Sequence, residues 1–133
     1  MLSVKIITPL GLYKACDAKQ VNATSVEGEF GLLPNHIPLV CMLSISKLQL
    51  VLEDDTRKDY AVAGGLFQYA NNEVRILTDS IEGEDEIDLE RAKRAKERAE
   101  KRLAAKDVDT NMRRAEVALQ KAINRISIVE NKS

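Results

Sequence analysis

The spacing of apolar residues changes once along this chain of 133 residues, near residue 86. Before that point apolar and polar residues alternate in short runs, as in KLQLVLE at 47–53 and EVRILTD at 73–79. A period of two is typical of half-buried antiparallel strands. After residue 86 apolar residues recur every three or four positions, the period of an amphipathic helix. The order predicts an α+β fold: an antiparallel β-sandwich domain over residues 1–85, followed by a two-helix hairpin domain over residues 86–133.

Two pairs of residues mark turns or bends within the predicted sandwich. Asn71 and Asn72 separate FQYA from EVRIL, and because asparagine tolerates left-handed dihedral angles, we expect a tight β-hairpin there. Gly64 and Gly65 interrupt a strand-like run. Glycine within a strand indicates a bulge or a close approach of another backbone segment.

The helical part divides into two predicted helices. The first runs from about Asp88 to Ala104, with Asp88 as the N-cap, and the second begins near Asp109. The link of about five residues between them is too short for parallel helices, so we expect an antiparallel hairpin.

The seam between these helices is rich in alanine. Each buried methylene contributes about 0.8 kcal/mol, so an alanine seam stabilises the pairing far less than a leucine seam would. The helices themselves are rich in strong helix formers, which predicts a movable arm that a ligand or a partner could close or open. The predicted seam positions are Leu89, Ala92, Ala95, Ala99 and Leu103 in the first helix, and Met112, Ala115, Leu119, Ala122, Ile126 and Val129 in the second.

The two predicted domains carry charge of opposite sign. Residues 1–85 have 7 basic and 12 acidic side chains, whereas residues 86–133 have 13 basic and 9 acidic ones. Five cations lie one residue before a seam position, so we expect them to line one lip of the hairpin: Arg91, Arg98, Arg114, Lys121 and Arg125. Several cations around one point favour a polyanionic ligand. The alternative is a solvated helix face, because glutamates are interleaved with the cations.

Few residues could carry catalysis or hold a metal ion. Cys16 and Cys41 form no CxxC pair, and His36 is the one histidine, so we expect neither a metal site nor an active site. The acidic run at 82–86 lacks the ligand spacing of a calcium loop and is interpreted as a solvated linker. No apolar run is long enough to span a membrane and no leader pattern is evident, which predicts a cytosolic setting.

Three stretches carry a resemblance to a known family: SVEGEFGLLPNHIPLV at 25–40, YAVAGGLFQYANNEVRILTD at 60–79 and IDLERA at 87–92. Together they resemble the epsilon subunits of bacterial F-type ATP synthases over essentially the whole chain. The resemblance implies a non-catalytic rotor subunit, attached to the gamma subunit and to the membrane rotor ring. It implies that the loop at 29–37 lies near that ring. It also implies a peripheral location on the cytoplasmic face of the bacterial plasma membrane.

The resemblance also implies a regulatory role for the helices. They would lie folded against the sandwich or extend into the alpha/beta catalytic head, where they inhibit ATP hydrolysis. Some bacterial members bind ATP at the folded hairpin through a pattern similar to I-D-x-x-R-A, which implies ATP as a regulatory ligand and no required cofactor. The pattern stands here as Ile87, Asp88, Arg91 and Ala92, and the resemblance adds Glu82, Arg98, Lys121 and Arg125.

The resemblance also implies a role for each of these residues. Asp88 would accept a hydrogen bond from adenine or ribose, Ile87 and Ala92 would contact the base, and the cations would hold the phosphates. Lys121 stands where a nucleotide-binding relative has arginine, and lysine lacks the planar bidentate fork of arginine. Two other functions remain open: a structural stalk adaptor that binds no nucleotide, and a nucleic-acid binder. The second is disfavoured because the helical arm has no aromatic residue to stack on bases.

Overall fold

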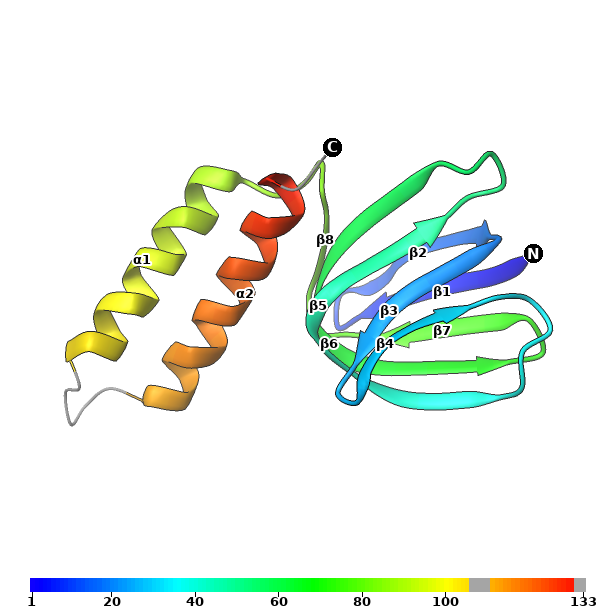
Figure 1. Cartoon of the computed structure of the whole chain (residues 1–133), viewed down its shortest axis with the longest axis horizontal. Helices are drawn as coiled ribbons and strands as arrows, with labels where there is room; N and C mark the ends of the chain where they lie inside the picture. Colours follow the sequence, from blue (N-terminus) through cyan, green and yellow to red (C-terminus); the bar gives the residue numbers. More distant parts are fainter. Residues whose placement is uncertain (106–110, 131–133) are drawn as a thin grey trace.

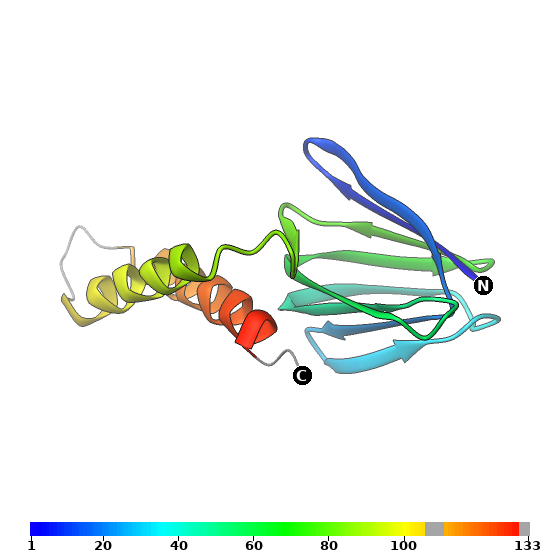
Figure 2. The same ribbon diagram turned by 90° about the horizontal axis from the view of Figure 1, so that it is seen from above.

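The computed structural model describes residues 1–105 and 111–130. A β-sandwich forms one body, and two antiparallel helices lie beside it, which confirms the predicted α+β fold (Figures 1 and 2). The strands are β1 (Leu2–Thr8), β2 (Gly11–Ala18), β3 (Gln20–Ser25), β4 (Gly28–Leu32), β5 (Leu39–Val51), β6 (Arg57–Ala70), β7 (Glu73–Leu77) and β8 (Ile81–Gly83). The helices are α1 (Leu89–Ala105) and α2 (Met112–Glu130).

The strand order is β2-β1-β7-β6-β5-β3-β4, and β8 also pairs with β6. The pairs are antiparallel except β1 with β7, which is parallel and departs from the all-antiparallel expectation. Strand β6 changes neighbours along its length, because residues 60–62 pair with β8 and residues 66–70 pair with β7. The long strands β5 and β6 therefore connect the N-terminal strands to β8, the strand that precedes the helices.

Both predicted turn signals are confirmed. Asn71 and Asn72 have positive φ angles of 51° and 60° and connect β6 to β7 at the pair Ala70 and Glu73. Gly64 and Gly65, with φ of 82° and 135°, mark the bend where β6 leaves one partner for the next. A Cβ atom at Gly65 would lie 2.2 Å from the Leu77 carbonyl oxygen, so the close backbone approach requires glycine there.

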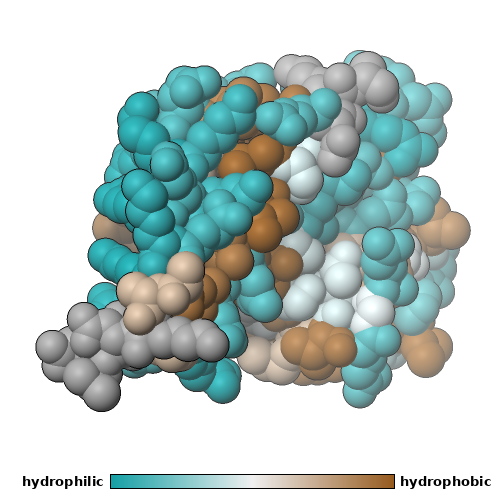
Figure 3. All heavy atoms as spheres, turned by 60° about the vertical axis from the view of Figure 1, so that its left-hand side comes forward, coloured by the Kyte–Doolittle hydropathy of each residue, from teal (hydrophilic) through white to brown (hydrophobic). Residues whose placement is uncertain are grey.

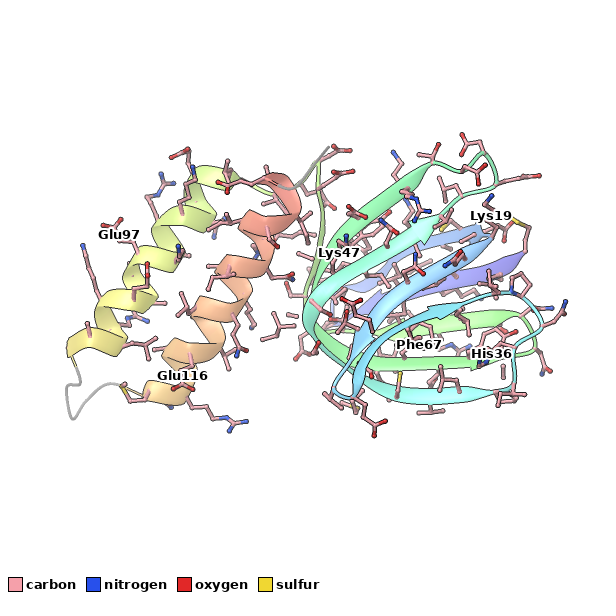
Figure 4. All side chains as sticks on the ribbon, viewed as in Figure 1. Lys19, His36, Lys47, Phe67, Glu97 and Glu116 are labelled. Carbon is pink, nitrogen blue, oxygen red and sulfur yellow. The ribbon has the colours of Figure 1, made fainter. Side chains whose placement is uncertain are left out.

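The core lies between the two layers of strands. Phe67 is fully buried near its centre and meets the ring of Phe30 edge-on, with ring centroids 5.0 Å apart (Figure 4). The alternation seen in the sequence places Leu48 and Leu50 in this core, as well as Val74. Truncating such a side chain to alanine typically costs about 2–5 kcal/mol. These buried side chains therefore contribute much of the stability of the sandwich.

Both helices begin at a side-chain cap. The carboxylate of Asp88 accepts the Arg91 backbone N–H at 3.1 Å, which confirms the predicted cap of α1. The Asn111 side chain accepts the Arg114 N–H at 3.0 Å, so α2 begins at Met112 rather than near Asp109. Asp109 itself lies outside the described residues. Neither α1 nor α2 is long and apolar enough to cross a membrane.

The contact between the helices is narrow and made mainly of alanine. The side chains buried along it, each at most 3% exposed, are Ala92, Ala99, Ala115 and Ala122. The predicted leucine positions are only half-buried, so the seam is narrower than its sequence pattern suggested. One ion pair spans the hairpin, with Lys93 Nζ and Glu130 Oε1 3.7 Å apart. Figure 3 shows that exposed apolar side chains also form a stripe between hydrophilic ones on this side of the molecule.

Helix α2 lies between α1 and the sandwich (Figures 1 and 2). Asn124 Nδ2 donates to the Ser46 carbonyl oxygen at 2.8 Å, and Arg125 Nε lies 2.6 Å from Glu82 Oε1 on β8. Ile128, 4% exposed, shares this helix face because it follows Asn124 and Arg125 by one turn. Helix α2 therefore joins the hairpin to the sandwich, with hydrogen bonds from Asn124 and Arg125.

Candidate functional site

A pocket of about 370 Å³ opens where the start of α1, the second half of α2 and strand β8 meet. Six of the eight predicted ligand contacts line it together: Glu82, Asp88, Arg91, Ala92, Arg98 and Arg125. Glu86 and Ala95 complete the lining. The structure thus brings residues from three separate segments to one opening.

Helix α1 supplies the floor and two of the cations. Arg91 and Arg98 are seven residues apart, about two helical turns, and therefore project from one face. Ala92 and Ala95 leave an apolar surface between them. Within residues 1–105 and 111–130, neither guanidinium forms an ion pair. Both groups are therefore available to an anionic ligand.

Helix α2 supplies the third cation, Arg125, which is already paired. Its guanidinium contacts Glu82 at 2.6 Å, and both side chains are about 30% exposed, at 29% and 31%. The pair joins α2 to β8 at the pocket edge. An anion that reaches Arg125 must share the guanidinium with Glu82 or displace the carboxylate.

Asp88 has a structural role as well as a place in the pocket. One carboxylate oxygen caps α1 through the Arg91 N–H, yet the side chain is exposed and a carboxylate has room for several hydrogen bonds. The cap fixes the position of the carboxylate relative to the first turn of α1. Asp88 can therefore accept a further hydrogen bond from a ligand without losing the cap.

Two predicted contacts lie outside this pocket. Ile87 is half-buried just before the cap but does not line the opening. Lys121 lies where α2 meets β5 and β6, beside Ile45 and Ala61. The reason is helical geometry, because Lys121 shares the sandwich-facing side of α2 with Asn124 and Arg125. Neither Lys121 nor Arg114 lines this pocket, and the expectation that the five flanking cations share one lip of the hairpin stays a prediction.

The acidic segment at 82–86 is not the solvated linker that its composition suggested. Its first part belongs to β8, paired with β6. The Glu86 carboxylate accepts hydrogen bonds from the Tyr13 hydroxyl and, at 2.9 Å, from the Gly83 N–H. Ala95 could have been found from the alanine stripe, since it lies one turn beyond Ala92. Glu86 could not, because its partner Tyr13 is 73 residues away in the sequence.

The pocket is lined by charged groups of both signs and by the methyl groups of two alanines. Three guanidinium groups face three carboxylates there. Hydrogen bonds from Tyr13 and then from the Gly83 N–H lower the pKa of Glu86, so this carboxylate is charged at neutral pH. Among the described residues, the lining holds no histidine, cysteine, serine or lysine. The guanidinium groups can bind and orient an anion.

A larger opening, about 720 Å³, lies over strands β3, β4 and β5. Amide and hydroxyl side chains dominate its lining, including Asn22, Ser44 and Gln49, with Lys47 as its one cation. It lacks the grouped guanidinium groups of the smaller pocket. The larger opening therefore lacks the grouped cations expected of a polyanion site.

Comparisons with known proteins agree with this architecture. The family described as ATP synthase, Delta/Epsilon chain, beta-sandwich domain matches residues 1–84, and the corresponding long alpha-helix domain matches residues 85–130. The ATP synthase epsilon chain of an Exiguobacterium species is 46% identical over 97% of this chain and 96% of its own length. That of Bacillus velezensis is 40% identical over 98% of both chains.

Solved structures show the same fold at lower identity. A chain in the Euglena gracilis mitochondrial ATP synthase (OSCP/F1/c-ring) superposes with a TM-score of 0.82 at 22% identity, covering 98% of this chain and 79% of that one. A chain from the central stalk and c-ring of the Tetrahymena thermophila enzyme gives a TM-score of 0.55 at 14% identity. Two family matches that together cover nearly the whole chain, and full-length relatives at 40% identity or more, establish that the chain belongs to the epsilon subunits of the F-type ATP synthases.

Proposed function

We propose that this epsilon subunit is a non-catalytic rotor component whose helical hairpin senses ATP. The proposal rests above all on the pocket in which cations of both helices meet a carboxylate of the sandwich. A ligand that touches Arg91, Arg125 and Glu82 together contacts α1, α2 and β8 at once. Such a site is complete only when the hairpin is folded against the sandwich.

The chemistry of the pocket suits a nucleoside triphosphate. Arg91, Arg98 and Arg125 would hold the phosphates, as guanidinium groups bind phosphate oxygens in pairs. Ala92 would contact the base, and Asp88 would accept a hydrogen bond from the adenine amine or a ribose hydroxyl. Glu82 would contact the ligand at the edge of the pocket while it orients Arg125. Ile87 and Lys121 would contribute only from the periphery.

Binding of ATP to the folded form alone would stabilise that form. The free energy gained is RT ln(1 + [ATP]/Kd), about 2.7 kcal/mol at a hundredfold excess over Kd. An alanine seam with few buried methylenes is weak enough for this amount to decide the equilibrium. When ATP falls, the hairpin would leave the sandwich and extend toward the alpha/beta catalytic head, where it would inhibit hydrolysis.

The rest of the proposal concerns assembly. The sandwich would attach to the gamma subunit and the membrane rotor ring, with the loop at 29–37 near the ring. In Figure 4 this loop, marked by His36, lies at the end of the sandwich away from the helices. The subunit would then couple proton flow to ATP synthesis from the cytoplasmic face of the plasma membrane, without crossing the membrane.

Calorimetric titration of the full chain with ATP and with ADP tests the nucleotide site. We expect saturable 1:1 binding of ATP and at least tenfold weaker binding by Arg91→Ala or Arg98→Ala, about the loss expected for one charge-assisted contact. Arg94→Ala is the matched control, because Arg94 lies exposed on α1 outside the pocket. Equal affinities in all three variants would refute the assignment of the site.

One observation favours the rival function of a fixed structural adaptor. Helix α2 contacts the sandwich directly, through Asn124 to Ser46 and Arg125 to Glu82. A cross-link between cysteines placed at positions 46 and 124 distinguishes the two. If the arm moves, the link relieves inhibition of hydrolysis by the assembled enzyme at low ATP. If the helices never leave the sandwich, the link changes nothing.

A further inference from the structure

Glu86 is held against the sandwich although it lies in the segment that leads to α1. Its Oε1 accepts the hydroxyl of Tyr13 on β2 and the N–H of Gly83. Its own N–H donates to the Gly83 carbonyl oxygen at 2.9 Å, which closes the segment into a turn. The Glu84 N–H donates to the Asp59 carbonyl oxygen at 3.1 Å and ties the same turn to β6. The turn is therefore fixed to two different strands.

This turn determines where α1 begins. It ends two residues before Asp88, the cap of α1, and Glu86 itself lines the pocket. Among the described residues, no hydrogen bond or ion pair joins the side chains of α1 to the strands. Within the described residues, α1 contacts α2 through the alanine seam and the Lys93–Glu130 ion pair, and the turn precedes its cap. The position of Arg91 relative to the sandwich therefore depends on how firmly the turn is anchored.

Tyr13 is itself well fixed. Its ring is half-buried and meets the ring of Tyr60 edge-on, with centroids 6.3 Å apart. Gly83 allows the turn to lie close to both rings, because a Cβ atom there would be 3.2 Å from Glu86 Oε1 and 3.4 Å from Tyr60 Cε1. Burial and then the Glu86 carboxylate raise the pKa of Tyr13, so the hydroxyl keeps its proton. The donor and the acceptor of this hydrogen bond both persist at neutral pH.

We propose that Tyr13 is a positioning residue for the ATP site, acting through Glu86 to hold the start of α1 in the arrangement that binds ligand. This inference rests on the proposed function. It means that Tyr13, a strand residue outside the pocket, affects how tightly ATP binds. A site that is assembled before the ligand arrives binds the ligand more tightly, because less conformational entropy is lost on binding. When only a fraction of molecules has the assembled site, the apparent Kd rises as that fraction falls.

The test is ATP titration of full-length variants. We expect Tyr13→Phe to raise the Kd for ATP about fivefold, which corresponds to the loss of one hydrogen bond worth about 1 kcal/mol. Glu86→Ala should do the same. Glu86→Gln keeps an acceptor for the hydroxyl and should bind ATP more tightly than Glu86→Ala does. The double variant Tyr13→Phe/Glu86→Ala should be no weaker than Glu86→Ala alone, since both changes remove one interaction.

A matched control separates positioning from general loss of stability. Tyr69→Phe also removes one hydroxyl hydrogen bond from the sandwich, to Asn72 Oδ1 at 3.0 Å. The Tyr69 ring lies 6.1 Å from that of His36, which Figure 4 shows at the end of the sandwich away from the helices. The ATP affinity of Tyr69→Phe should be unchanged. Hydrogen exchange without nucleotide gives a second readout, because the Glu84 and Glu86 amides should exchange faster in Tyr13→Phe than in Tyr69→Phe.

The outcomes distinguish the two proposals. Weaker ATP binding by Tyr13→Phe than by Tyr69→Phe, with rescue in Glu86→Gln, supports the inference. ATP binding by the unmodified chain that is equally tight in Tyr13→Phe and Tyr69→Phe overturns the inference and leaves the ATP site standing. No ATP binding by the unmodified chain overturns both, whatever the exchange rates are.

Discussion

Ile128 provides the sharpest test of the idea that the hairpin is only marginally held. It is 4% exposed on the sandwich-facing side of α2. Replacing it with alanine removes three carbon atoms, worth about 0.8 kcal/mol each. Buried Ile→Ala changes typically cost about 2–5 kcal/mol, and we take the lower end because a surface contact can relax by opening. A loss of about 2 kcal/mol corresponds to roughly a 30-fold change in an equilibrium constant.

If the folded hairpin is marginally stable, this loss lowers the fraction of molecules with a closed hairpin and weakens the apparent ATP affinity by nearly the same factor. We expect Ile128→Ala to weaken ATP binding about 30-fold in calorimetry, while the sandwich keeps its thermal transition. Ile123→Ala is the matched control, because Ile123 lies on the same helix but is 46% exposed. Both changes alter helix propensity equally. Equal ATP affinities in Ile128→Ala and Ile123→Ala would show that the closed form has a large excess of stability, and the switch would be refuted.

Three further predictions concern single residues. Gly65→Ala places a Cβ atom against the Leu77 carbonyl oxygen at a strained φ of 135°, so the melting temperature of the sandwich should fall by more than 5 °C, corresponding to about 2 kcal/mol or more. The lowered pKa of Glu86 means that its contribution to stability is present above its unfolded pKa and is lost as pH falls through the folded value. The stability difference between the unmodified chain and Glu86→Gln should therefore shrink in acid, and a difference that does not depend on pH would contradict this. Asp88→Ala should lower hairpin stability by about 1 kcal/mol through loss of the cap, measured by helix circular dichroism on heating, whereas Asp88→Asn should retain it.

The fold could be predicted because its signals are local. Period-two alternation placed Leu48, Leu50 and Val74 in the core, and the glycine and asparagine pairs marked the bend and the turn. The start of α2 was placed too early because Asp109 and Asn111 can both serve as caps, and the sequence does not choose between them. The parallel pairing of β1 with β7 depends on contacts between distant segments, which periodicity does not report.

The candidate site, too, could be predicted where its residues share one helix, and could not where distant segments meet. Arg91, Arg98 and Ala92 share a helix face, so their grouping follows from helical geometry once the hairpin is assumed. Lys121 lies beside β5 and β6 rather than in the pocket, because the second helix contacts the sandwich as well as α1, and the sequence pattern showed only the contact with α1. Glu86 and Tyr13 meet through the tertiary fold alone, so their contact needed the structure.

The central proposal, that ATP holds the hairpin closed, can be tested directly by measuring a distance. Nitroxide labels at Lys19 on the sandwich and Glu116 on α2 lie on separate bodies (Figure 4), and Cys16 and Cys41 are replaced by serine in the labelled chain. With saturating ATP, pulsed electron spin resonance should give one narrow distance distribution. Removing ATP should add a second, clearly different population that ADP does not suppress as well. Identical distributions with and without ATP would contradict the proposal.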